Sequence, residues 1–217
     1  MKKQLAILAL LLPCYSYSLV QWNNAGVPAN VTNDDLEIVT SPQLAAGTTT
    51  ISATVSDIDI TLDKDITLRG NDAGQSTLVF NAEAGRTITV HLDESSLRLR
   101  GSNNNLAWPL IVRITGEGTV IFDIEEGERL DLGSTNTAGA TSFYVVFDGT
   151  TSPQVIFRQH DEEGVVLGRR SNLGFEVAGV GVSLVQAMRF ELVDGDSEDD
   201  SVLLRLKDGS GIDLNVT

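Results

Sequence analysis

The sequence has 217 residues, a formal net charge of −15, one cysteine and two histidines. A negative balance of this size disfavours nucleic acids and anionic lipid surfaces as partners. A single cysteine cannot form a disulfide bond within the chain. The fold must therefore rest on a hydrophobic core, on repetition or on bound metal ions.

The first 18 residues have the pattern of a secretory signal peptide. Two lysines precede an apolar run at residues 5–12, which is too short to span a bilayer of about 30 Å as a helix. Small residues at Ser16 and Ser18 suit a signal peptidase, so we expect cleavage after Ser18. Cys14 follows a proline instead of the small residue of a lipobox, which disfavours lipidation. We expect a secreted, periplasmic or cell-surface protein of a bacterium.

Residues 19–50 form a polar segment with little alternation, in which only residues 34–39 suggest a short helix or strand. A stacked β-fold needs a cap to keep its first layer from pairing with other chains. We therefore expect residues 19–50 to be an N-terminal cap or an extended segment. Trp22 is a candidate to pack over the open end.

Residues 51–217 consist of short segments in which apolar and polar residues alternate with the period of a β-strand. Residues 57–62 (DIDITL), for example, place Ile58, Ile60 and Leu62 on one face. Clusters of Gly, Asn, Asp and Ser separate these segments and mark turns. The pattern predicts an all-β domain over residues 51–217.

An internal repeat favours a solenoid. Residues 77–90 align without gaps on residues 119–132, a shift of 42, and a third copy begins at Gln154. The shared unit is a strand, an acidic turn that ends in Gly, and a second strand, which can bury its apolar face only by stacking. We predict a right-handed parallel β-helix of eight or nine coils with about 20 residues each. A β-sandwich with similar hairpins is the alternative.

The candidate signal peptide is followed by short strands rich in Thr, Asn and Gly, such as residues 66–70 (ITLRG) and 114–120 (ITGEGTV). In this combination, the chain resembles the β-helical passengers of bacterial autotransporters and related surface adhesins. The resemblance covers roughly residues 50–217 and implies binding or adhesion at the cell surface. The chain departs from these proteins because it has no segment for their C-terminal membrane barrel, so we do not expect it to anchor itself.

Carboxylates are the abundant reactive groups. Asp57 and Asp59 stand two apart on one strand face and are the candidate catalytic pair for glycosidic chemistry. A lyase would also need a basic residue, for which Arg98, Arg100, Arg169 and Arg170 are the candidates. A solvated outer face is the simpler interpretation of the two aspartates. The two histidines, His91 and His160, are far apart in sequence and do not by themselves predict a zinc site.

A second acidic cluster suggests calcium, which takes six to eight oxygen ligands from such turns. Its spacing matches neither an EF-hand nor a calcium-binding β-helix repeat, and a solvated turn is the simpler interpretation. The candidate calcium ligands are Asp194, Asp196, Glu198, Asp199 and Asp200.

We therefore expect an exported, non-enzymatic β-solenoid that binds an extracellular glycan or protein or builds a surface structure. The alternative is a carbohydrate-active enzyme, a polysaccharide lyase or glycoside hydrolase, on the same fold. No cofactor other than calcium is expected. Neither nucleic acid nor an integral membrane segment is expected, and the ends of a solenoid invite end-to-end self-association.

Overall fold

A computed structural model describes a large part of the chain: residues 19–22, 30–102, 107–133, 141–147, 152–160, 164–167, 171–177, 188–192, 204–206 and 211–216. The predicted signal peptide and Cys14 lie outside these residues. All regular elements of the described part are β-strands. A search of the same residues for a helix that is long and apolar enough to cross a membrane found none.

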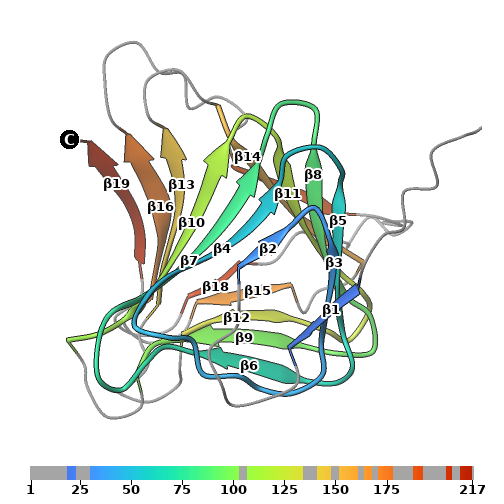
Figure 1. Cartoon of the computed structure of the whole chain (residues 1–217). Coiled ribbons are helices and arrows are strands. Elements are labelled where there is room, and N and C mark those ends of the chain that lie inside the picture. Colours follow the sequence, from blue (N-terminus) through green and yellow to red (C-terminus); the bar gives the residue numbers. More distant parts are fainter. Residues whose placement is uncertain are drawn as a thin grey trace, which may run out of the picture.

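The strands form three sheets that make the three sides of a solenoid (Figure 1). Sheet A contains, in spatial order, β1 (Leu19–Trp22), β3 (Asp35–Ile38), β5 (Ile58–Leu62), β8 (Thr87–Leu92), β11 (Thr119–Ile124), β14 (Gln154–Gln159) and β17 (Met188–Leu192). Sheet B contains β2 (Val31–Thr32), β4 (Gly47–Ala53), β7 (Ser76–Ala82), β10 (Leu110–Gly116), β13 (Thr141–Phe147), β16 (Asn172–Val177) and β19 (Gly211–Val216). Sheet C contains β6 (Ile66–Arg69), β9 (Leu97–Arg100), β12 (Leu130–Leu132), β15 (Val165–Leu167) and β18 (Leu204–Leu206).

From β4 to β19 the chain visits sheets B, A and C in turn, and neighbouring strands within each sheet run parallel. A sandwich of hairpins would instead pair consecutive strands antiparallel. The predicted all-β fold and parallel β-helix are confirmed, and the β-sandwich alternative is excluded for the described strands.

The predicted coil length of about 20 residues is wrong. In sheet B, Ser76, Leu110 and Thr141 are successive neighbours, 34 and 31 positions apart. A coil of this length holds three strands and three corners, so the chain makes fewer coils than the eight or nine expected. Sheets A and B contain seven described strands each.

The internal repeat identifies stacked neighbours for two of its three copies. The second and third copies stack in register, because Phe122 pairs with Phe157 and Leu132 with Leu167. The first copy does not stack on the second: Phe80 lies in sheet B and pairs with Ile114, whereas Phe122 lies in sheet A. Strands on all three sides share one pattern of alternating inward apolar residues, so similarity alone cannot identify the side to which a strand belongs.

The interior is built from the inward residues that the alternation predicted. Ile58, Ile60, Val90 and Phe122 are all at most 1% exposed. A group of phenylalanine rings fills its centre, and Phe122 stacks on Phe157 with their ring centroids 5.6 Å apart. Stacking of this kind adds to the free energy gained by burial of apolar area. The outward residues of each strand are consequently left to define the surface.

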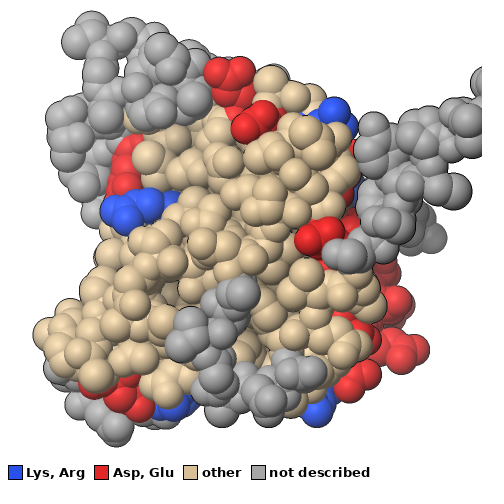
Figure 2. Space-filling view, in the orientation of Figure 1, with Lys and Arg blue, Asp and Glu red and all other residues tan. Residues whose placement is uncertain are grey.

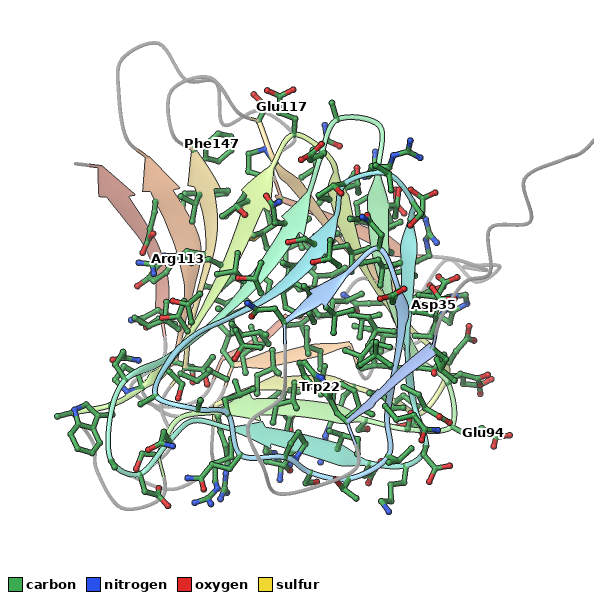
Figure 3. All side chains as sticks on the ribbon, in the orientation of Figure 1. Trp22, Asp35, Glu94, Arg113, Glu117 and Phe147 are labelled. Atoms are coloured by element: carbon green, nitrogen blue, oxygen red, sulfur yellow. The ribbon has the colours of Figure 1, made fainter. Side chains whose placement is uncertain are left out.

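Three strands within residues 31–53, namely β2, β3 and β4, already belong to the sheets. Residues 35–38 form strand β3, not a helix, and pair with β1 and β5. Trp22 is 4% exposed and packs into the core cluster, at the end of the solenoid where β1 and β2 lie (Figure 3). β1 and β2 are the terminal strands of sheets A and B on this side.

Candidate binding groove on sheet A

The parallel register of sheet A stacks outward side chains from successive coils into one row. This row contains His91 of β8, Asp123 of β11, Arg158 of β14 and Glu191 of β17. Neighbouring strands of a sheet lie about 4.8 Å apart, so each of these residues lies within reach of the next. The result is a ladder on one outer face of the solenoid, in which an imidazole, a carboxylate, a guanidinium and a second carboxylate follow one another.

A cavity of about 400 Å³ opens at the start of this ladder. It is lined by Asp59, Thr61, Leu62, His91, Leu92, Asp93, Asp123 and Glu125. This lining, which we call the sheet A groove, offers four carboxylates and one imidazole but no Lys or Arg. Such a lining creates a negative potential that attracts cations and hydrogen-bond donors and repels anions.

The negative charge continues beyond the groove along the same side of the molecule. Asp and Glu side chains gather at the right-hand edge of Figure 2, next to the position of β3 and β5 in Figure 1. Asp35 of β3 lies on this side, and Arg113 of sheet B lies on the opposite side (Figure 3). Asp35 therefore extends the carboxylates of sheet A beyond the groove lining.

Asp59 and His91 form one interaction across the groove. The Nε2 atom of His91 lies 3.0 Å from Oδ1 of Asp59, and the Asp59 side chain is 64% exposed. The backbone N–H of Asp59 donates in turn to Oδ1 of Asp35, 2.9 Å away. Each carboxylate is thus held by the next coil, which fixes its position without burying it.

A second group, Asp123, Glu125 and His160, lies at the end of the groove. Nε2 of His160 is 3.2 Å from Oδ1 of Asp123 and 3.6 Å from Oε1 of Glu125. One ligand atom of each residue lies within 4.8 Å of the others. The side chains of His160 and Asp123 are each 18% exposed. This donor set, one imidazole and two carboxylates, can hold a divalent metal ion.

Arg158 closes this side of the ladder. One of its guanidinium nitrogens is 3.8 Å from Oδ1 of Asp123, and its Nε lies 3.3 Å from a carboxylate oxygen of Glu191. Arg158 therefore shares its charge between two carboxylates of neighbouring coils. It offsets only part of the negative charge of the groove.

The structure separates the two aspartates that the sequence suggested as a catalytic pair. Asp59 lines the groove, whereas Asp57 is not part of its lining. Oδ1 of Asp57 accepts a hydrogen bond from the backbone N–H of Thr87 at 2.9 Å, a contact that joins two coils. Asp57 therefore has a structural contact, and Asp59 is the member of the pair placed for binding or chemistry.

Of the proposed basic partners, Arg98 and Arg100 belong to β9 of sheet C and do not line the groove. Arg98 lies on sheet C, where its Nε donates to Asp131 at 2.9 Å. Burial lowers the pKa of the neighbouring Arg100 below its ordinary value, and Arg69 and Arg98 lower this pKa further, while Asp72 opposes them. Residues 169 and 170 and the candidate calcium ligands at 194–200 lie outside the described residues.

Sequence reasoning missed Asp93, Asp123 and Glu125, and it did not connect His91 with His160. The signal was present in the alignment of the second and third repeat copies. That alignment places Arg158 beside Asp123, and one coil earlier His91 occupies the same position. Two histidines that are distant in the sequence thus both adjoin Asp123, one through strand register and one through a hydrogen bond.

Comparisons with protein-family models, with curated proteins and with solved structures found no match to this chain. The groove is therefore interpreted from its own geometry and charge.

Proposed function

We propose that the protein is an exported, non-enzymatic binding module that recognises an extracellular partner through the sheet A groove. The observation that carries this proposal is the lining on the face of sheet A, whose described residues offer four carboxylates and one imidazole and include no Lys or Arg. Polar groups held by strands are already ordered, so a partner loses little free energy in organising them. The adhesin-type passengers that the sequence resembles are consistent with such a role.

The charge of the groove narrows the class of partner. Carboxylates accept hydrogen bonds from the hydroxyl groups of neutral glycans and from the cationic side chains of basic protein segments. They repel uronate-rich or sulfated polysaccharides. A neutral glycan or a basic segment of an extracellular protein fits the groove, and an acidic polysaccharide does not.

A binding panel tests the proposal. Wild-type protein and the Asp59→Asn/Asp123→Asn variant would be titrated against neutral glycans, basic peptides and acidic polysaccharides. We expect saturable binding to a neutral or basic member of the panel, weakened at least about tenfold in the variant. Binding that is confined to acidic polysaccharides, or that is unchanged in the variant, would contradict the proposal.

A carbohydrate-active enzyme is the second candidate, and one observation favours it: several carboxylates converge on a single cavity, with Arg158 beside Asp123. Product analysis after incubation with the same glycans separates the two functions. Cleavage that disappears in Asp59→Ala but persists in Asp57→Ala would establish the enzyme and exclude a purely binding role. Asp57 is the matched control because it lies on the same segment but outside the groove lining.

A further inference from the structure

We propose that Asp123, Glu125 and His160 form a binding site for one divalent transition-metal ion of the zinc class. The ion would lie at the end of the sheet A groove. This inference rests on the proposed function, because an ion there would take part in partner recognition by the same groove.

The first support is geometric. A tetrahedral ion about 2.1 Å from each of its ligand atoms holds those atoms about 3.4 Å apart. The distances from Nε2 of His160 to Oδ1 of Asp123 and to Oε1 of Glu125 are 3.2 and 3.6 Å. The two distances from His160 therefore already suit an ion of this size, and the ligand atoms of Asp123 and Glu125 lie within 4.8 Å of each other.

The second support is chemical. Imidazole nitrogen is a ligand for zinc, nickel, copper and iron, whereas calcium and magnesium prefer oxygen alone. A set of one imidazole and two carboxylates matches the three protein ligands found at open zinc sites, in which water or a partner completes the shell. Glu125 is 43% exposed and His160 is 18% exposed, so the ion would be held firmly and still be reached from solvent.

The third support is electrostatic. Asp59 and Asp93 line the same cavity as Asp123 and Glu125, and the lining contains no Lys or Arg. Arg158 contacts Asp123 but is shared with Glu191. A divalent cation would relieve the repulsion between these carboxylates. The ion would also give the groove an open coordination position for a hydroxyl, carboxylate or imidazole of the partner.

Isothermal titration of the full chain with ZnCl2 alone, without any partner, tests the site. We expect one ion per chain in the wild type, and binding at least about tenfold weaker in His160→Gln and in Glu125→Gln. Glu83→Gln is the matched control for Glu125→Gln, because it removes an exposed carboxylate outside the groove lining and should change the affinity less than about twofold. Thermal unfolding of each variant checks that it is folded, and the exposed Glu125 provides a second ligand variant if His160→Gln is unstable.

Three results would overturn the inference. The first is no saturable binding of Zn2+ up to millimolar concentration. The second is equal Zn2+ affinity in the wild type, His160→Gln and Glu125→Gln, which would place the ion elsewhere on the chain. The third is tighter binding of Ca2+ than of Zn2+ at this site. If the chain binds Zn2+ but binds no member of the panel, the metal site stands and the proposed function is refuted. If the chain binds a member of the panel but does not bind Zn2+, the proposed function stands and the metal site is refuted.

Discussion

Gly116 is the last residue of β10, at the corner that leads to β11, and it lies against Ala82 of the neighbouring coil. Its φ is +93°, and a Cβ placed on it would lie 2.1 Å from the carbonyl oxygen of Ala82. That same oxygen accepts hydrogen bonds from the N–H groups of Glu117 and Gly118. We expect Gly116→Ala to lower the free energy of unfolding by about 3 kcal/mol or more, as measured by urea titration.

Gly85 serves to measure the effect of a positive φ without the close contact to Ala82. Its φ is +72°, but an added Cβ would meet nothing within 4 Å. Gly85→Ala should cost only the conformational strain of about 1–2 kcal/mol. Equal losses in Gly85→Ala and Gly116→Ala would show that the close approach to Ala82 does not matter.

Asn33 organises another corner. Its φ is +59°, and its Oδ1 accepts hydrogen bonds from the backbone N–H groups of Thr54 at 2.6 Å and Val55 at 2.9 Å. Asn33→Ala removes the acceptor and leaves a strained backbone, so we expect it to lower the free energy of unfolding by about 2 kcal/mol. Asn33→Asp keeps the acceptor and should lose less than half as much in the same chemical denaturation experiment. A similar loss in both variants would contradict this role for Oδ1.

The strands of sheets A and B contribute the phenylalanines that hold successive coils together. Phe157 stacks on Phe122 and on Phe190, with ring centroids 5.6 and 5.0 Å away, and it is completely buried. Phe157→Ala leaves a cavity in this stack and should lower the free energy of unfolding by about 3–5 kcal/mol. Phe175 is only partly buried, and its ring centroid lies 6.3 Å from that of Phe147. Phe175→Ala should therefore lower the free energy of unfolding by less than half as much. Equal losses in a paired thermal and urea denaturation series would argue against the stack.

At the scale of the strand, sequence alternation was a reliable guide. It placed Ile58 and Ile60 inward and Asp59 outward, since burial of one face has the period of the β-strand. Which strand lies beside which was harder to predict, because Phe80 and Phe122 occur in nearly identical local patterns on different sides of the solenoid. From β4 onward, paired residues of neighbouring strands are between 29 and 39 positions apart, and their pairing depends on corner lengths that vary from coil to coil.

At the scale of the whole molecule, the same limit explains why the groove was not predicted. Its four carboxylates come from β5, from β11 and from the residues that follow β8 and β11. They form a site only when three coils are stacked in register. Asp59 was identified because its own strand shows the alternation. Asp123 and His160 form a site only together with residues of other coils.

The predicted cleavage of a signal peptide is tested on the whole molecule. We expect the protein recovered from outside the cytoplasm of an expressing bacterium to begin at Leu19, the first residue of β1. Intact-mass analysis would then give a chain shorter by 18 of the 217 residues. A chain that begins at Met1, or at a lipidated Cys14, would contradict the predicted cleavage after Ser18.

The central claim is that the sheet A groove, and not the general negative charge of −15, recognises the partner. Two double variants with the same change in charge separate these explanations: Asp123→Asn/Glu125→Gln within the groove, and Glu83→Gln/Glu94→Gln at exposed positions outside its lining. The measurement is the affinity of each for the partner found in the binding panel, at one fixed salt concentration. We predict a loss of at least about tenfold for the groove variant and less than about twofold for the other. Equal losses in both variants would contradict the claim.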